Sequence, residues 1–330
     1  MTFTHHILGL SATDVSELLT VDLAIDSQRT AFRNLATGEA ILPDRLLLDG
    51  AAGSVAFCYA ARLDAGSGAV CKFGSVNPGN VDADLPTISA LVTVLDEVSG
   101  LPVAVMDGTS VTTIRTSAAS AVAVEALATP GASRLAVIGS GVQAVAHVRA
   151  IARVIDLTDV VMWSPDAPTL AEAVRVLDDE HEFPVRMGDS AAETVTGAQI
   201  IATCSSSSTP VLDDAWVADG ATIVSVGSFA PDRFEIPPDL VARADSVVVD
   251  HAPTAMEHAG PVVRALADGV LTEDDLVEIG DVLVGTKPAR TSPEQVIYYN
   301  SVGVGIQDAA AARTVLEAAR RTGRGQQISL

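Results

Sequence analysis

Leu135-Ala136-Val137-Ile138-Gly139-Ser140-Gly141-Val142-Gln143-Ala144 is the stretch that decides the fold of this chain. Its first four residues are apolar and fit a buried strand, which runs into the pattern Gly-x-Gly-x-x-Ala. Residues 145–154 follow with helical apolar spacing and few helix breakers. A strand, a glycine turn and a helix in this order form the fingerprint of a dinucleotide-binding unit.

Each small residue of this turn has a physical role. Gly139 permits the tight turn, Gly141 lets the backbone approach a pyrophosphate, and Ala144 lets the helix pack closely on the strand. The amides at the helix start, at Val142 and Gln143, then face the phosphates. A glycine pattern alone is weak in a chain rich in alanine and glycine, so the prediction depends on the flanking strand and helix.

Strands and helices continue to alternate through the middle of the chain. This alternation indicates an α/β fold with a parallel sheet and right-handed crossovers. We therefore expect a Rossmann-type dinucleotide-binding domain over residues 121–303. The strands are expected at 135–138, 160–163, 200–203, 222–226 and 246–249.

The N-terminal third is richer in strands and fits a mixed, partly antiparallel sheet. We expect it to form a second, α+β domain over residues 1–120, completed by residues 304–330. Its expected elements are a helix at 13–36, strands at 46–62 and 67–76 around a turn at 64–68, a hairpin of 91–96 with 102–107, a helix starting near Thr116, and a last helix at 306–321.

Length and composition exclude several classes of protein. The 330 residues suffice for two domains, and no apolar run reaches the about 18 residues needed to span a bilayer. Residues 1–6 lack the pattern of a signal peptide, so we expect a cytosolic protein. Three scattered cysteines, Cys58, Cys71 and Cys204, argue against a disulfide framework and show no metal-ligand spacing, so we expect no metal.

The net charge of −22 disfavours nucleic acid and anionic membranes as partners. Only two lysines occur, Lys72 and Lys287, so arginine carries most of the positive charge. A cluster of cations is therefore exceptional in this chain, and an anionic cofactor and an anionic small-molecule substrate would need one. His147, on the helix after the glycine turn, is expected to be structural.

Several motifs together resemble the ornithine cyclodeaminase and mu-crystallin family. They occur in family order over residues 43–308, and the Arg-Thr-Ser-Ala-Ala-Ser motif before the glycine turn is quite specific. The matching segments are Pro43-Asp44-Arg45, KFGSVNPGN at 72–80, IRTSAASA at 114–121, the Gly139 turn, ATCSS at 202–206, VGSFAPD at 226–232 and NSVG at 300–303.

The resemblance implies a Rossmann domain that binds NAD(P) and a substrate domain that also forms the interface of a homodimer. It also implies NAD(P)-linked chemistry at carbon–nitrogen bonds. Members of the family include cyclodeaminases, alanine dehydrogenases, cyclic ketimine reductases and opine-type dehydrogenases.

The residues after the second Rossmann strand bear on the choice of cofactor. Ser164 and Asp166 are expected beside the adenosine ribose, and NADP-binding relatives often place an arginine where Pro165 stands. An acid there would accept hydrogen bonds from ribose hydroxyls and repel a 2′-phosphate, so the sequence favours NAD over NADP. Asp166 can equally cap the next helix.

Further cofactor contacts come from the resemblance. Thr203, Cys204 and Ser205 end a strand, where open parallel sheets bind ligands, although an ordinary polar loop is the alternative. Cys204 has no motif-linked histidine and is expected to be a small buried residue, not a nucleophile. Thr116 either touches the cofactor or caps the helix expected to begin there. The remaining assignments to the cofactor are Val226, Gly227 and Val302.

Arg45, Lys72 and Arg115 are the expected substrate and catalytic residues. Each matches a family position that grips the substrate carboxylate, and surface exposure of each is the alternative. Arginine offers a planar fork with two parallel hydrogen bonds, and lysine adds a compact charge. An ammonium near an imine can also donate a proton, so Lys72 has a possible second role. Gly303 is assigned to the substrate site by its motif.

Phe229 is where the chain departs from the cyclodeaminase pattern. Ornithine cyclodeaminases carry an aspartate at this position, which binds the side-chain amine. Phenylalanine cannot hold an ammonium by charge, and desolvating a cation without a partner is costly. We expect Phe229 to line the substrate site, where a phenyl ring beside the nicotinamide suits an apolar substrate body. Core packing is the alternative role, and the carboxylate is absent in either case.

The sequence therefore favours an NAD(P)H-dependent reductase of a small imino acid, such as the cyclic ketimine 1-pyrroline-2-carboxylate. Three alternatives remain at this level. They are an ornithine or lysine cyclodeaminase with a substitute acid, an opine-type or alanine dehydrogenase, and a non-catalytic mu-crystallin-like binding protein.

Overall fold

The computed structural model describes residues 5–83, 85–288 and 290–329. Contacts divide the described chain into two compact units. Unit 1 runs through Arg115 and resumes at Val304, and unit 2 runs from Thr116 to Gly303. The sequence placed this boundary between residues 120 and 121, and most of the N-terminal stretch inspected for a signal peptide lies outside the described residues.

Unit 1 is built on a seven-stranded mixed sheet. β1 is parallel to β6 and antiparallel to β15, whereas the strands from β6 to β2 pair antiparallel with their neighbours. The strands in spatial order are β15 (Gln326–Ser329), β1 (His6–Leu10), β6 (Pro102–Asp107), β5 (Ile88–Leu95), β4 (Val70–Val76), β3 (Val55–Ala61) and β2 (Leu46–Asp49).

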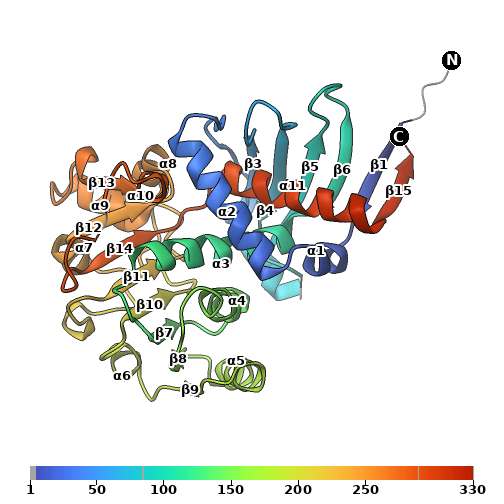
Figure 1. Ribbon diagram of the computed structural model, residues 1–330. Helices are drawn as coiled ribbons and strands as arrows, with labels where there is room; N and C mark the ends of the chain where they lie inside the picture. Colours follow the sequence, from blue (N-terminus) through green and yellow to red (C-terminus); the bar gives the residue numbers. More distant parts are fainter. Residues whose placement is uncertain (1–4, 84, 289, 330) are drawn as a thin grey trace. The chain divides into compact units, whose positions relative to one another are not determined.

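The described part of unit 1 contains three whole helices and two short 3₁₀ segments, and the first turns of a further helix, which continues into unit 2, also lie in it. The long helices α2 and α11 lie side by side over one face of the sheet, where α11 contacts β3, β4 and β5 (Figure 1). Alanines at 309–312 are buried and let α11 approach closely. The elements are α1 (Ala12–Leu18), α2 (Val21–Ala36), α11 (Gly305–Thr322), η1 (Ala51–Gly53) and η2 (Pro78–Ala83).

Two expectations for unit 1 were too coarse. Residues 13–36 form two helices, because Ser11 caps α1 and Thr20 accepts a hydrogen bond from the amide of Leu23 and starts α2. The expected strand at 46–62 is a hairpin of β2 and β3, closed by the short helix η1. The expected hairpin of 91–96 with 102–107 is confirmed as β5 and β6.

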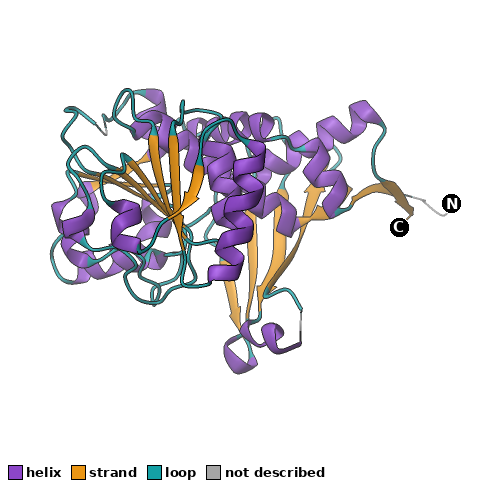
Figure 2. Ribbon diagram, turned by 90° about the horizontal axis from the view of Figure 1, so that it is seen from below, coloured by secondary structure: helices purple, strands orange, loops and turns teal. Residues whose placement is uncertain are grey.

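Unit 2 contains an eight-stranded sheet in which every recorded strand pair is parallel. Figure 2 shows its strands as a twisted fan with helices on both faces. The strands in spatial order are β13 (Leu276–Glu278), β12 (Ser246–Val249), β14 (Ile297–Asn300), β11 (Thr222–Ser225), β10 (Ile200–Thr203), β7 (Arg134–Ile138), β8 (Asp159–Trp163) and β9 (Val185–Met187).

The strand order of unit 2 reverses between β7 and β10, which is the switch point where doubly wound sheets bind ligands. The predicted α/β class and Rossmann-type sheet are thereby confirmed. The helical segments are α4 (Val142–Ile151), α5 (Ala167–Glu180), α6 (Ala191–Val195), η3 (Asp214–Trp216), α7 (Pro238–Arg243), α8 (Ala252–His258), α9 (Gly260–Ala267), η4 (Glu273–Asp275) and α10 (Ile279–Val284).

Helix α3 (Gly108–Leu127) begins eight residues before the predicted start near Thr116. Asp107 supplies its cap, because its Oδ1 accepts a hydrogen bond from the amide of Ser110 at 2.7 Å. The first turns contain glycine and several threonines, which have low helix propensity and hid the true start. The proposed capping role of Thr116 is therefore wrong, since Thr116 lies inside the helix.

Among the described residues, no helix has both the length and the apolarity to cross a membrane. The same residues contain no group of three or more histidine, cysteine, aspartate or glutamate side chains placed to share a metal ion. The cytosolic location stays a prediction.

Candidate functional site

The glycine turn after β7 needs glycine at its first position. Gly139 has φ +126°, and a Cβ there would lie 2.5 Å from the carbonyl oxygen of Cys204. Its amide donates to the carbonyl of Trp163 at 2.8 Å, and the amide of Cys204 donates to Ile138 at 2.8 Å. The turn is therefore held tightly between the ends of β8 and β10.

The N-terminus of α4 is open where an anion would approach. Gly141 is the N-cap and has no side-chain cap, and a Cβ there would meet nothing within 4 Å. Val142, although apolar, is 68% exposed, whereas Ala144 is buried against the sheet. The Oε1 of Gln143 is buried and finds no hydrogen-bond partner among the described residues. These features fit a dinucleotide whose pyrophosphate faces the helix amides.

Glu235 ties together the loops that follow β10 and β11. Its buried carboxylate accepts hydrogen bonds from the hydroxyls of Thr203 and Ser225 at 2.8 and 2.9 Å. It also accepts from the amide and hydroxyl of Ser205, each at 2.7 Å, and from the amide of Gly227 at 2.6 Å. The hydroxyls of Thr203 and Ser205 thus face Glu235, so this acid shapes the predicted cofactor loops.

Cys204 lies between these loops and the glycine turn. Burial raises the pKa of its thiol well above the usual range, and the charge of Glu235 acts in the same direction. A thiol in this setting stays protonated, which does not suit a nucleophile; the residue is nevertheless partly exposed and not buried as the sequence predicted. On the other sheet, the sulfurs of Cys58 and Cys71 lie 3.4 Å apart as free thiols, a proximity that their sequence spacing did not reveal.

Asp166 is the N-cap of α5. Its carboxylate accepts from the amide of Thr169 at 3.2 Å and from the hydroxyl of Thr169 at 2.6 Å. The amide of Asp166 itself reaches the hydroxyl of Ser164 at 3.4 Å. The capping alternative for Asp166 is therefore realised, and contact with a ribose stays a prediction.

The last assigned cofactor and substrate positions lie at the ends of β11 and β14. Val226 is buried, and a Cβ on Gly227 would meet the carbonyl of Ser205 at 2.2 Å. Val302 packs against the core of unit 2. Gly303 has φ +87°, and its amide donates to Oδ2 of Asp250 at 2.5 Å. Glycine is thus required at position 227 by the close approach of the Ser205 carbonyl and at position 303 by the positive φ.

Unit 1 contains a separate cluster of candidate residues, centred on Lys72. Strand alternation turns Lys72 toward the helix-covered face of β4, where it pairs in register with Tyr59 and Val92. Its side chain is 2% exposed, so the surface alternative is wrong. The Nζ lies 2.7 Å from Oδ2 of Asp308, 3.3 Å from the hydroxyl of Thr112 and 4.9 Å from the centre of the Tyr59 ring.

Arg115 reaches the same place from α3. Its Nε lies 3.2 Å from Oδ1 of Asp308, and its Nη1 donates to Oε1 of Gln307 at 3.3 Å. Arg115 is 5% exposed, so it too is no surface residue. Asp308 therefore bridges two cations that come from different elements, β4 and α3.

Arg45 precedes β2 and approaches from a third direction. Its Nη1 donates to the hydroxyl of Tyr59 at 3.3 Å, and its guanidinium lies 5.7 Å from the centre of that ring. The Nε of Arg45 is buried and lacks a hydrogen-bond partner within the described part of the chain. A buried cationic donor of this kind suits an anionic ligand.

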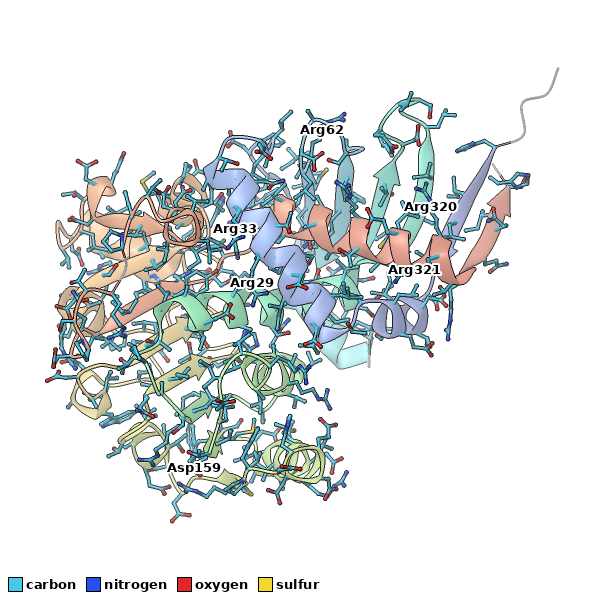
Figure 3. All side chains as sticks on the ribbon, viewed as in Figure 1. Arg29, Arg33, Arg62, Asp159, Arg320 and Arg321 are labelled. Atoms are coloured by element: carbon cyan, nitrogen blue, oxygen red, sulfur yellow. The ribbon has the colours of Figure 1, made fainter. Side chains whose placement is uncertain are left out.

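The electrostatics of Lys72 reflect this crowding. Burial lowers the pKa of its ammonium to about 8, and the charges of Arg115 and Arg45 lower it as well, while Asp308 raises it. Two other cations of unit 1, Arg33 on α2 and Arg320 on α11, are instead exposed to solvent (Figure 3). The three predicted residues thus form a cation cluster inside a chain of net charge −22.

Sequence reasoning missed four residues of these sites, namely Tyr59, Glu235, Gln307 and Asp308. A signal existed for the last two, since a neighbouring amide and acid directly precede a run of four alanines in a helix that must pack on a sheet. No comparable signal marks Glu235 or Tyr59, because their partners do not stand at helix or strand spacing from them.

Phe229 follows β11 and is partly exposed. The guanidinium of Arg233 lies 4.9 Å from the centre of its ring, a cation–π arrangement. Arg233 also donates to the carbonyl of Ser206 at 3.3 Å. The charged group stacked on Phe229 is therefore a cation, which is unfavourable for binding a substrate ammonium nearby.

The sequence matches a known family over residues 6–323, the Ornithine cyclodeaminase/mu-crystallin family. Among its relatives, the Delta(1)-pyrroline-2-carboxylate reductase of Bacillus cereus is 32% identical over 78% of this chain and 79% of that protein.

Solved structures show the same fold. The Delta(1)-pyrroline-2-carboxylate reductase of Thermococcus litoralis, in complex with NADH and L-proline, has a TM-score of 0.94 at 26% identity and covers 98% of this chain and 100% of its own. An archaeal alanine dehydrogenase, a dimer with bound NAD, has a TM-score of 0.93 at 30% identity. The match covers 98% of this chain and 99% of the alanine dehydrogenase chain.

Proposed function

We propose that this chain, which belongs to the ornithine cyclodeaminase/mu-crystallin family, reduces a small cyclic ketimine such as 1-pyrroline-2-carboxylate. The resemblance seen in the sequence motifs is thus confirmed. The protein is an NAD(P)-dependent oxidoreductase that acts on carbon–nitrogen groups, as its relatives are. The cation cluster of Arg45, Lys72 and Arg115 is the observation that carries the finer proposal.

The cation cluster is suited to bind the carboxylate of the imino acid. Arg45 presents its buried Nε, and the ammonium of Lys72 adds a compact charge. Arg115 is held by Asp308 and Gln307, so its guanidinium cannot rotate freely. A carboxylate gripped by several fixed donors presents the α-carbon in one orientation, which can lower the barrier by several kcal/mol, on the order of the effect of intramolecular positioning.

Reduction of the imine also requires a proton at nitrogen. The nicotinamide, when bound, supplies the hydride that reduces the imine carbon. Lys72 is protonated below its pKa of about 8 and can donate a proton to the nitrogen, directly or through an ordered water. In the reverse direction, the neutral amine of Lys72 accepts that proton.

Phe229 and Arg233 argue against cyclodeamination of ornithine or lysine. Such substrates carry a second ammonium, and the position where cyclodeaminases carry the aspartate that binds it holds Phe229, whose ring is stacked by the guanidinium of Arg233. Like charges repel, and no carboxylate stands at position 229 to offset the cost of desolvating a second ammonium. An apolar substrate body suits the phenyl ring better.

We favour NAD over NADP as the cofactor. Solved relatives bind NAD or NADH. Asp166 places an anion after β8, where a 2′-phosphate would be repelled. The open N-terminus of α4, with Gly141 and Val142, would hold the pyrophosphate in either case.

We also infer that the chain forms a homodimer through the sheet face of unit 1 that the helices leave uncovered. One row of side chains crosses β2, β3, β4 and β5 in register and therefore projects from this uncovered face. It consists of Leu46, Cys58, Phe73 and Leu91. Phe73 is 56% exposed and Leu91 is 57% exposed in the single chain. A row of exposed apolar side chains indicates an interface, and the archaeal relative is a dimer.

The direct test is to incubate the purified protein with 1-pyrroline-2-carboxylate and either NADH or NADPH, and to follow the nicotinamide absorbance. We expect oxidation of NADH with formation of proline. No change with either cofactor, across a panel of small imino acids and of keto acids with amines, would refute the proposal. Ammonia release from ornithine without net NADH change identifies a cyclodeaminase, and tight cofactor binding without any turnover identifies a binding protein.

A further inference from the structure

We infer that Asp308 is a positioning residue that orients Lys72 and Arg115 and keeps the ammonium of Lys72 protonated before substrate binds. The consequence for catalysis rests on the proposed function, whereas the electrostatic role does not.

The geometry is that of a buried bridge. The two carboxylate oxygens of Asp308 take one cation each, Arg115 at 3.2 Å and Lys72 at 2.7 Å. Asp308 is 1% exposed, so bulk solvent does not screen its charge from either cation. A carboxylate shared in this way fixes the separation of an ammonium on β4 from a guanidinium on α3.

The backbone of α11 is itself anchored at this point. The neighbouring Gln307 accepts hydrogen bonds at Oε1 from Nη1 of Arg115 and from the amide of Val304. Its carbonyl accepts from Nε2 of Gln28 on α2 at 3.2 Å. Because these contacts fix the first turn of α11, Asp308 has little freedom to follow the cations if they move.

The charges around Lys72 show why an anion is needed there. Two guanidiniums, Arg115 on α3 and Arg45 before β2, destabilise its charged form, and burial does so as well. The other groups that face it are neutral, namely the hydroxyl of Thr112 and the rings of Tyr59 and Phe57. Asp308 is the negative charge that opposes these effects.

The cluster therefore has three positive charges and one negative charge in its resting state. A substrate with a single carboxylate lowers the net charge further and leaves the cluster still cationic, so binding remains favourable. Without Asp308, Lys72 would lose its proton at lower pH. A neutral Lys72 neither attracts a carboxylate by charge nor donates a proton to an imine nitrogen.

The test uses the fact that the chain has only two lysines, Lys72 and Lys287. In protein labelled with ¹³C and ¹⁵N on lysine, the side-chain resonances are titrated by NMR, and a Lys287→Arg variant assigns the two signals. Lys287 is exposed and serves as the internal control. In Asp308→Asn, we expect the Lys72 titration to move to lower pH by about 1–3 units, the size of effect that one neighbouring charge has.

A Lys72 titration that is unchanged in folded Asp308→Asn would overturn the inference. If that variant does not fold, Asp308→Ser, which leaves room for water beside both cations, is titrated in the same way with the same expectation. Asp308→Glu keeps the charge and should restore the wild-type titration. A purely structural role for Asp308 predicts no difference between the Asn and Glu variants in this measurement.

A kinetic readout adds the link to catalysis. The alkaline limb of kcat/KM for imine reduction should move to lower pH in Asp308→Asn by the same shift that NMR records, while the Kd for NADH stays unchanged. An alkaline limb that does not follow the NMR shift overturns the catalytic part. If the wild-type protein reduces no imine, the proposed function fails, but the NMR titration still decides the electrostatic role of Asp308.

Discussion

The amide of Gly227 donates to the carboxylate of Glu235 at 2.6 Å, and a Cβ on Gly227 would lie 2.6 Å from the carboxyl carbon of Glu235. Glycine is therefore required where the carboxylate meets the backbone. Through this contact and those to Ser205 and Ser225, one buried anion holds the loops after β10 and β11 in place. The loops predicted to bind the cofactor thus depend on a residue that is fully buried.

We expect Glu235→Gln to destabilise the protein and to weaken NADH binding. The amide group would turn an NH₂ toward at least one of the donors, and a buried donor without its acceptor costs about 1–3 kcal/mol. Urea unfolding and fluorescence titration with NADH measure the two effects. Glu172→Gln, at an exposed position on α5, is the matched control and should change neither. Equal unfolding free energies for the two variants would contradict this account of Glu235.

The two glycines of the turn after β7 should respond differently to alanine. In Gly139→Ala, an alanine would have to adopt φ +126°, and its Cβ would lie 2.5 Å from the carbonyl oxygen of Cys204. The substitution should therefore lower the free energy of unfolding by several kcal/mol, on the order of other strained substitutions. Gly141→Ala meets open space at an ordinary φ of −74°, so stability should hold. Its Kd for NADH should nevertheless rise, because the methyl group would occupy the approach of the pyrophosphate.

Thermal unfolding and NADH titration of both variants decide the matter. If Gly141→Ala binds NADH as tightly as the wild type, the pyrophosphate does not approach the backbone at this residue. If Gly139→Ala is as stable as the wild type, the turn relaxes more easily than its geometry indicates.

Loss of Lys72 should remove reduction without removing cofactor binding. Lys72→Met keeps much of the volume but deletes both the charge and the proton donor, so we expect kcat/KM to fall by a factor on the order of 10²–10⁴, with an unchanged Kd for NADH. Lys287→Met is the control and should retain full activity. An active Lys72→Met variant would exclude both of the roles proposed for this lysine.

The pH dependence of reduction follows from the pKa of Lys72, which burial lowers to about 8. The protonated form is the one that binds a carboxylate and donates a proton, so kcat/KM should be highest below about pH 8 and fall as pH rises through that value. In the unfolded chain Lys72 keeps this proton up to the ordinary lysine pKa of about 10.4. Between about pH 8 and about pH 10.4 the unfolded state therefore binds a proton that the native state has lost, and the contribution of Lys72 to stability rises with pH. A profile of kcat/KM that stays flat to pH 10 would contradict the assignment.

The sequence predicted the parts of the structure that have short-range signals. The Gly139 turn with its strand and helix could be recognised because glycine spacing and apolar periodicity are local. The strands β9 and β13 were missed, since three residues carry too little periodicity to identify a strand. β14 was missed as well, although β10, β11 and β12 of the same four-residue length were predicted. β14 lies between β11 and β12 in the sheet, a position that only the tertiary fold determines.

The candidate sites show the same limit. Motif resemblance identified Arg45, Lys72 and Arg115 as a set, but it gave no counter-ion for them. Asp308 is distant from Lys72 in sequence, so its place on a helix that packs on the sheet did not reveal that Lys72 and Arg115 are its partners. The sequence spacing of Cys58 and Cys71 likewise gave no sign that their sulfurs are neighbours. Their proximity follows from the antiparallel pairing of β3 with β4.

The uncovered sheet face of unit 1 provides a test of assembly. Phe73→Glu and Leu91→Glu each place a charge in the exposed apolar row, so a dimer formed through this face should dissociate, while the folded chain should lose little stability. Sedimentation equilibrium measures the change, and Val98→Glu, in an exposed turn, is the control. A wild-type protein that is monomeric, or variants that remain dimeric, would show that this face is not the interface.

His147 gives the chain a source of acid sensitivity that is separate from catalysis. The imidazole is fully buried, with Nδ1 2.7 Å from the carbonyl of Gln143 and Nε2 2.9 Å from the hydroxyl of Ser120. Nδ1 donates and Nε2 accepts in the neutral form that suits these partners. Burial lowers the pKa of His147 to about 4, so the expected structural role is also an electrostatic one.

The sign of the effect follows from linkage. Between about pH 6.5, where an unfolded histidine titrates, and about pH 4, the unfolded state binds the proton and the native state does not. Stability should therefore fall with acid, with a limiting slope of about 1.4 kcal/mol per pH unit from this one group. His147→Gln removes the titrating imidazole, so the free energy of unfolding should depend less on pH between pH 7.5 and 5. His6→Gln, at an exposed position, should leave this pH dependence unchanged. Urea unfolding across this range compares the slopes, and identical slopes for the wild type and His147→Gln would mean that other groups cause the acid sensitivity.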